Sequence, residues 1–191
     1  LERSLDEFGF KEDLPFEIKM AQSQYSNTDH IEAEIQLADS GYGQGQILIK
    51  PLHMACIYSA FCNEGNILKQ YQAYQQDTAT QYSIEEAFSK ETADRVTEGL
   101  KKVINDPNGT GYAAHRDDVL LAGKTGTAEI KATKEDTSGT ELGWFAIFTP
   151  ERSVEQPILI ISMTEDVKGR GGSGYVVEKD KLVLEEWFRS N

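Results

Sequence analysis

The sequence predicts an α+β fold in which helices pack on an antiparallel sheet. Three segments have the length and the apolar content of strands, at about residues 119–131, 142–148 and 158–163. The connector at 149–153 is short enough to join the last two strands as an antiparallel hairpin. Apolar residues at helical spacing, before and after the strands, predict the helices that cover the sheet.

The predicted strand at 142–148 is apolar on both faces. Trp144, Ala146 and Phe148 point one way, and Phe145 and Ile147 point the other. The strand at 158–163 opens with four consecutive aliphatic residues and has the same property. Because such strands are usually covered on both sides, we expect the sheet to lie inside a core.

Two helices are predicted in the first third of the chain. Residues 1–9 place apolar residues on one helical face and end at Gly9, which can adopt the left-handed conformation that stops a helix. Pro51 suits the first turn of a helix that runs to Asn63. Residues 10–46 between them are polar and irregular, which is typical of a functional loop. The second helix carries a small-residue stripe that predicts close packing: Leu52, Ala55, Cys56, Ser59 and Ala60.

Two longer helices are predicted on either side of the strands. Ser89 is a favourable N-cap for a helix that runs to Asn105. Its apolar face comprises Ala93, Val96, Leu100, Val103 and Ile104. A terminal helix follows a glycine-rich stretch, with Ser173 as its cap. Two apolar i,i+4 pairs are expected to dock that helix on the sheet, Val183/Trp187 and Leu184/Phe188.

The composition argues against several classes of function. The chain has 19 Lys+Arg and 32 Asp+Glu, a net charge of −13, whereas nucleic acids need a basic surface. His30, His53 and His115 lack zinc-ligand spacing, and no acidic cluster has calcium-loop spacing, so we expect no metal. Cys56 and Cys62 point to different faces of the expected helix, so we expect no disulfide between them.

Residues 169–174 read G-x-G-x-x-G, after a strand and before a helix. This is the position of a dinucleotide fingerprint, but no second parallel strand and no acidic ribose ligand follow it. We therefore interpret it as a flexible strand-to-helix connection, and expect no cofactor.

The sharpest chemical signal is Lys124-Thr125-Gly126, in the strand-like string LLAGKTGTAEI. On a strand, Lys124 and Gly126 share one face and Thr125 lies on the other. A fixed cation beside a hydroxyl suits a carboxylate ligand, and a glycine lets another group approach the strand closely. A backbone N–H just beyond the glycine can help to stabilise an oxyanion. Taken alone, the tripeptide is better explained as a surface lysine and an ordinary strand glycine.

The longer string GKTGTAE, residues 123–129, resembles the third motif of the penicillin-recognising serine enzymes, as it stands in class B penicillin-binding proteins. The stretch DSGYGQGQ at 39–46, followed by Ile49, Pro51 and the small-residue helix, resembles the same family. Residues 110–112 (TGY) and 143–145 (GWF) fit as well. The resemblance covers nearly the whole chain and is strongest to low-affinity, penicillin-resistant members from Gram-positive bacteria. It implies the penicillin-binding protein or β-lactamase-like transpeptidase fold.

The chain departs from the family pattern in one respect. No serine in it begins an S-x-x-K or an S-x-N motif, and both precede the 39–46 stretch in the family. We therefore expect residues 1–191, which begin with Leu1 rather than Met, to be an excised C-terminal portion of a transpeptidase domain. Alone, that portion is expected to be inactive.

The resemblance implies a role for each matching residue. Lys124 would supply positive potential and orient the serine of the second motif. Thr125 would bind the substrate or antibiotic carboxylate, and Gly126 would leave room beside the nucleophile helix. Thr127 would give its backbone N–H to the oxyanion hole and its hydroxyl to the carboxylate. Residues at the cleft rim would be Glu129, Tyr42 and Gln44, with simple turn packing as the alternative explanation for Tyr42 and Gln44.

The implied activity is that of a D,D-transpeptidase that cross-links peptidoglycan stem peptides and is acylated by β-lactam antibiotics. The parent protein would be anchored on the outer face of the plasma membrane, and this piece, which has no membrane-length apolar run, would be soluble. The family's other two strands come from upstream, which would leave the 158–163 strand with a free edge. That edge predicts dimerisation, burial in a crystal contact or pairing with the missing half.

Other functions remain open from the sequence. One is a non-catalytic module, either a β-lactam sensor or a cell-wall peptide-binding protein, because sensors share these motifs. Another is a β-lactamase, although the polar insert at 132–141 and the 39–46 stretch weigh against it.

Overall fold

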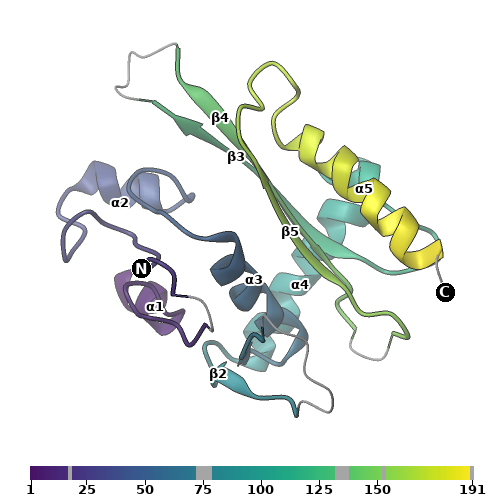
Figure 1. Ribbon diagram of the computed structural model, residues 1–191, viewed down its shortest axis with the longest axis horizontal. Helices are drawn as coiled ribbons and strands as arrows, with labels where there is room; N and C mark the ends of the chain where they lie inside the picture. The colour runs from purple at the N-terminus through teal and green to yellow at the C-terminus, as the bar shows by residue number, and fades with distance from the viewer. Residues whose placement is uncertain (17–18, 72–78, 132–137, 152–153, 190–191) are drawn as a thin grey trace. The chain divides into compact units, whose positions relative to one another are not determined.

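The computed structural model describes residues 1–16, 19–71, 79–131, 138–151 and 154–189 of the 191-residue chain. Parts of the loop predicted at 132–141 and of the connector predicted at 149–153 lie outside these described residues. The chain divides into two compact units, Leu1–Ala93 and Asp94–Asn191, and each is described by itself. The predicted combination of helices and an antiparallel sheet is confirmed (Figure 1).

The first unit is mostly helix and loop. The described elements are α1 (Glu2–Glu7), α2 (Glu34–Ser40), α3 (Pro51–Ser59), the short 3-10 helix η1 (Ala60–Cys62), β1 (Ile67–Leu68) and β2 (Tyr82–Ile84). β1 and β2 pair as an antiparallel ribbon. Gly9 has φ +85° just after α1, as expected of a helix-stopping glycine. Helix α2 lies within residues 10–46, where the sequence predicted only irregular chain.

The small-residue stripe of α3 and η1 faces the core of the first unit. Cys56, Ser59 and Ala60 are buried, which confirms the predicted close packing. The sequence analysis missed His53, which is 1% exposed. Its Nε2–H donates to the Phe8 carbonyl at 2.8 Å, so Nδ1 accepts from Ser23 Oγ at 2.7 Å. Burial lowers the pKa of His53, which favours this neutral, doubly bonded imidazole.

The second unit contains the predicted sheet. Helix α4 (Lys90–Asn105) leads into it and is followed by η2 (Tyr112–Ala114), β3 (Ala122–Ile130), β4 (Thr140–Phe148), β5 (Leu159–Thr164) and α5 (Ser173–Arg189). The strand order is β3-β4-β5 and both pairings are antiparallel. Figure 1 shows α5 lying along this sheet. Among the described residues β5 pairs with β4 alone, so the predicted edge strand is present.

The core of the second unit lies between α5 and one face of β4. Phe145 and Ile147 are 0% exposed and pack with Ile104, Leu121 and Leu184. The opposite face of β4 is buried as well, since Ala146 is 5% and Phe148 0% exposed. The expectation that this strand is covered on both faces is therefore confirmed.

Three details of the predicted helices are wrong. Val183 and Trp187 are exposed, because the face of α5 that meets the core is the one centred on Leu184. Val96 is exposed on α4 for the same reason, as it lies off the face that carries Ala93 and Leu100. Ser173 is the first residue of α5 and not its cap. The predicted N-cap of α4 is confirmed, because the Thr92 N–H donates to Ser89 Oγ at 3.2 Å.

Candidate active site

Strand β3 brings the Lys124-Thr125-Gly126-Thr127 sequence into one continuous ladder with β4. Lys124 lies opposite Ala146, Thr125 opposite Phe145, Gly126 opposite Trp144 and Thr127 opposite Gly143. Because side chains alternate along a strand, Thr125 and Thr127 share the Phe145 face, and Lys124 and Gly126 lie on the other. The two-faced arrangement predicted from the sequence is confirmed.

Lys124 is exposed, and its ammonium donates to the Thr125 carbonyl at 2.7 Å. Beside it, Gly126 is open: a Cβ built there would meet only Trp144 Cβ, at 3.6 Å. Gly123, three residues before Gly126, is closed, since its Cβ would lie 2.5 Å from the Ala146 carbonyl and 2.9 Å from Ile104 Cδ1. The strand is thus packed tightly at its start and leaves space beside the lysine.

Thr125 is 7% exposed, and its hydroxyl oxygen lies 2.6 Å from that of Thr110. Either hydroxyl can be the donor in this pair. Thr110 precedes η2 in the TGY sequence that supported the family resemblance, but the sequence analysis gave it no role. The signal that could have found it is its hydroxyl, in a short turn between α4 and η2.

Thr127 links β3 to the beginning of α5. Its Oγ1 accepts a hydrogen bond from the Ser173 N–H at 3.1 Å. Gly172, with φ +59°, lies so near that an added Cβ would be 2.9 Å from the same oxygen. One lone pair of the Thr127 hydroxyl is therefore used inside the unit, while its own proton stays available to an acceptor.

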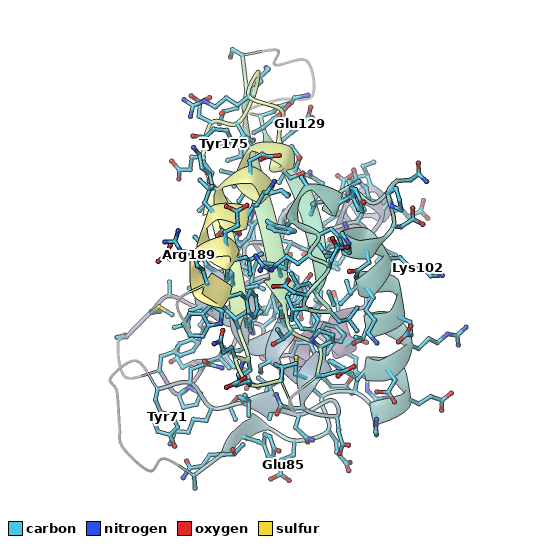
Figure 2. The ribbon with its side chains drawn as sticks, turned by 90° about the vertical axis from the view of Figure 1, so that its right-hand side faces the viewer. Tyr71, Glu85, Lys102, Glu129, Tyr175 and Arg189 are labelled. Atoms are coloured by element: carbon cyan, nitrogen blue, oxygen red, sulfur yellow. The ribbon has the colours of Figure 1, made fainter. Side chains whose placement is uncertain are left out.

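Glu129 is exposed near the end of β3, where its carboxylate pairs with the Lys131 ammonium at 2.7 Å. Figure 2 shows Glu129 and Tyr175 at the same end of the sheet in the second unit. Exposed ion pairs of this kind are worth little energetically. The position suits a rim residue, and that role stays a prediction.

Tyr42 and Gln44 belong to the first unit and stand in a turn that follows α2. Tyr42 is 70% exposed, and its hydroxyl donates to the Asp39 carboxylate at 2.9 Å. The Gln44 N–H donates to the Asp39 carbonyl at 3.0 Å. Gly43 and Gly45 both have positive φ, at +82° and +73°, which explains the glycines of the GYGQG sequence.

Two features of the described residues bear on the sequence arguments about metals and dinucleotides. Within them, no three His, Cys, Asp or Glu side chains gather as a metal site would require. Residues 169–172 connect β5 to α5, but β5 is antiparallel to its neighbour. A dinucleotide fingerprint needs a parallel βαβ unit, so the sequence interpretation of this stretch as a connection stands.

Comparison with known proteins identifies the family. A family model described as the penicillin-binding protein transpeptidase domain matches residues 1–181. The chain belongs to this penicillin-binding protein transpeptidase family. The resemblance to class B penicillin-binding proteins, inferred from the GKTGTAE and GYGQG sequences, is confirmed.

Two curated relatives of this transpeptidase-family chain cover it to different extents. Penicillin-binding protein 3 of Bacillus subtilis strain 168 is 39% identical over 189 residues, which is 99% of this chain and 27% of the relative. Penicillin-binding protein 2a of Streptococcus pneumoniae strain D39 is 32% identical over 108 residues, 53% of this chain and 14% of the relative. The chain thus spans about a quarter of the length of the first relative.

Solved structures of penicillin-binding proteins share the fold. The transpeptidase domain of Burkholderia pseudomallei penicillin-binding protein 3 has a TM-score of 0.73 at 20% identity, over 96% of this chain and 56% of that one. A ceftriaxone acyl-enzyme complex of penicillin-binding protein A from Mycobacterium tuberculosis has a TM-score of 0.70 at 20% identity, over 95% of this chain and 41% of that one. The expected transpeptidase fold is therefore confirmed.

Proposed function

We propose that the chain is the C-terminal part of the transpeptidase domain of a D,D-transpeptidase that cross-links peptidoglycan. The observation that carries the proposal is the geometry of β3. In this strand the exposed Lys124 lies beside the open Gly126. The edge of β3 that faces away from β4 has no strand partner among the described residues. Such an edge can receive an extended peptide, while the lysine supplies the positive charge that a peptide carboxylate needs.

The reaction has two covalent steps. A serine hydroxyl attacks the carbonyl carbon of the penultimate D-alanine of a stem peptide, and its proton passes to a base. The tetrahedral intermediate collapses to an ester as the terminal D-alanine leaves with a proton on its amine. An amine of a neighbouring stem peptide then attacks the ester, forms the new amide and returns the proton to the serine. We propose that the serine and its lysine base come from an upstream part of the parent protein, since this sequence has neither motif.

The residues of β3 would stabilise the two negative charges of this reaction, the substrate carboxylate and the oxyanion of the tetrahedral intermediate. Lys124 orients the second-motif serine and holds positive potential near the substrate carboxylate, which Thr125 binds. The backbone N–H of Thr127 would be one of the two oxyanion donors, where such a donor is typically worth 10²–10³ in rate. Its hydroxyl would also face the carboxylate. Glu129, Tyr42 and Gln44 are proposed as rim residues.

β-Lactam antibiotics would bind in the same place. They carry a carboxylate beside a strained amide, so they satisfy the same cation, hydroxyl and oxyanion donors and form the acyl-enzyme. We propose that the parent protein is a low-affinity, Gram-positive class B member that contributes to antibiotic resistance. It would work in cell-wall biogenesis on the outer face of the plasma membrane. No described helix of this chain is long and apolar enough to span a bilayer.

The free edge of β5 supports a proposal about partners. Leu159–Thr164 is half-buried along its length, and among described residues it is paired on one side only. We propose that the edge pairs with the remaining half-domain of the parent, or with a second copy when that half is absent. Light scattering should show a dimer of the isolated chain, and a monomer with an uncovered edge in its crystal would contradict this.

The decisive experiment is covalent labelling with a fluorescent penicillin. The full-length protein should label and lose the label when excess benzylpenicillin is added first. The isolated chain should not label, because it holds no S-x-x-K serine. Labelling of the isolated chain, or none of the full-length protein, would contradict the proposed function.

A further inference from the structure

The Thr110–Thr125 contact is the shortest side-chain hydrogen bond at the proposed site. The two hydroxyl oxygens are 2.6 Å apart, although the residues are 15 positions apart in the chain. Thr125 is 7% exposed, whereas Thr110 is exposed to solvent. A hydroxyl rotates to suit its partners, so a neighbour this close decides where the Thr125 proton points.

Thr110 is held by the turn that ends α4. The Gly109 N–H donates to the Asp106 carbonyl at 2.7 Å, and the Gly111 N–H donates to the Val103 carbonyl at 3.0 Å. Both glycines pack against the last turn of α4: a Cβ at Gly109 would collide with the Val103 carbonyl, and one at Gly111 would lie 2.7 Å from Ile104 Cδ1. The backbone on either side of Thr110 is therefore fixed.

Asn105 ties the same turn to the start of β3. Its side-chain amide donates to the Lys101 carbonyl at 2.7 Å and to the Leu121 carbonyl at 2.8 Å. Its Oδ1 lies 3.1 Å from His115 Nδ1, just after η2. Asn105 therefore links the end of α4 to the residue before β3 and to the residue after η2. These links hold the Thr110 turn close to Thr125.

The polarity of the pair has a chemical consequence. A carboxylate only accepts hydrogen bonds, so Thr125 can bind one only if its own O–H is free to donate. That requires Thr110 to be the donor within the pair. If Thr125 donated to Thr110, it would present lone pairs to the carboxylate and repel it.

We propose that Thr110 is a positioning residue that acts through Thr125: it donates to Thr125 Oγ1 and so directs the Thr125 proton to the carboxylate of the substrate or β-lactam. This inference rests on the proposed function and adds to it a residue that is distant in sequence. The competing explanation is that Thr110 only fastens the 106–111 turn to β3.

The test measures the second-order acylation rate constant of the full-length protein with benzylpenicillin. Thr110→Val keeps the shape of the side chain and removes the hydroxyl, and should lower the constant about fivefold, the scale of one hydrogen bond between neutral groups. Thr110→Ser should restore it to within about twofold of the unmodified protein, because it returns the donor. Thr140→Val is the matched control, since it removes a threonine hydroxyl that donates to Asp166 at 3.0 Å elsewhere in the sheet, and it should not change the rate.

Two further measurements separate positioning from fastening. In a Thr125→Val background, Thr110→Val should have no additional effect, because the two hydroxyls act as one unit. With benzylpenicillin methyl ester, which has no carboxylate, Thr110→Val should leave the rate unchanged. Additive effects of the two substitutions, or an equal loss with the ester, would overturn the inference in favour of the fastening role.

The outcomes also distinguish this inference from the proposed function. If the unmodified full-length protein is not acylated by benzylpenicillin, the proposed function fails. If it is acylated and Thr110→Val reacts at the same rate, the function stands and the role of Thr110 is refuted.

Discussion

The two stretches that carry the family motifs are held in different ways. Lys124–Thr127 stand in a continuous strand ladder, and the hydroxyls of Thr125 and Thr127 are bound by Thr110 and Ser173. The 39–46 stretch is a turn that begins at the end of α2. Tyr42 and Gln44 bond to Asp39 within it, and Gln46 Oε1 fastens its end by accepting from the Asn27 N–H at 2.7 Å and the Gln36 side-chain amide at 3.1 Å. Each belongs to its own unit of the chain.

This difference indicates which of the two stretches holds its side chains more accurately. A site on a strand is held more accurately than one on a turn, and accuracy matters most for groups that touch developing charge. We therefore expect substitutions in β3 to change rate or stability strongly. Substitutions in the turn should change them little, because an exposed side chain such as Tyr42 can readjust.

The largest effect should come from Lys124→Met in the full-length protein. Removing the cation should lower acylation by benzylpenicillin about 100-fold, the typical scale for a preorganised electrostatic group. Folding should be unaffected, because the side chain is exposed. Fluorescent-penicillin labelling over time measures the rate, and Lys102→Met, an exposed lysine of α4, is the control. An equal loss in both variants would contradict the proposed role of Lys124.

Two glycines of β3 offer a matched pair of alanine substitutions. Gly123→Ala should lower the free energy of unfolding by about 2 kcal/mol, because its Cβ would press on backbone and on Ile104. Gly126→Ala should leave stability unchanged, since it meets only Trp144 at an ordinary distance.

Urea denaturation gives both stabilities. The same Gly126→Ala variant should acylate about tenfold more slowly if the strand must be approached closely there. A destabilised Gly126→Ala or a stable Gly123→Ala would contradict the contrast between the open and the closed part of the strand.

Asp180 lies in the contact between α5 and β5. It is 4% exposed on α5, with Oδ1 accepting from Ser162 of β5 at 2.7 Å and Oδ2 unpartnered in the described structure. Burial raises its pKa above the ordinary 3.8, so the folded state binds the proton more tightly than the unfolded state. The stability that comes from the protonated Asp180 is fully present below pH 3.8. It is lost as the pH rises through the higher pKa that Asp180 has in the folded state.

Asp180→Asn should therefore stabilise the chain at pH 7, by about 1 kcal/mol, because the amide keeps an acceptor for Ser162 and carries no buried charge. The gain should shrink as the pH falls toward 4. Thermal unfolding at several pH values measures it, and a gain that is independent of pH would show that ionisation of Asp180 is not the cause.

The smallest effect is expected in the turn. Tyr42→Phe removes a hydrogen bond to Asp39 from a 70% exposed side chain, so the free energy of unfolding should change by less than about 0.5 kcal/mol. The acylation rate should stay within about threefold of the unmodified protein. A loss as large as that of Lys124→Met would make the turn as important as the strand and break the comparison.

The parts of the fold that the sequence predicted are those with strong local signals. The strands at 142–148 and 158–163 are apolar on both faces, and α4 has a good N-cap and long periodicity. Helix α2 escaped prediction because Glu34–Ser40 is short and its only buried residue is Ser40. The ribbon of β1 and β2 escaped because each strand is two or three residues long.

The candidate site was predictable along the strand but not across it. Alternation on β3 correctly separates Lys124 from Thr125. The partners of its hydroxyls are not neighbours in sequence: Thr110 lies 15 positions before Thr125, and Ser173 lies 46 positions after Thr127. The sequence analysis considered His53 only as a zinc ligand, because its hydrogen-bond partners Ser23 and Phe8 lie 30 and 45 positions away.

The hydrogen bond from the Ser173 N–H to Thr127 Oγ1 connects the first turn of α5 to β3. Gly172 stands at φ +59° against Thr127 Oγ1, so any side chain there would push on the hydroxyl or pull the first turn of α5 outward. Under the proposed function, a substitution of Gly172 would therefore change the rate of β-lactam acylation while leaving every residue of the GKTGTAE sequence intact.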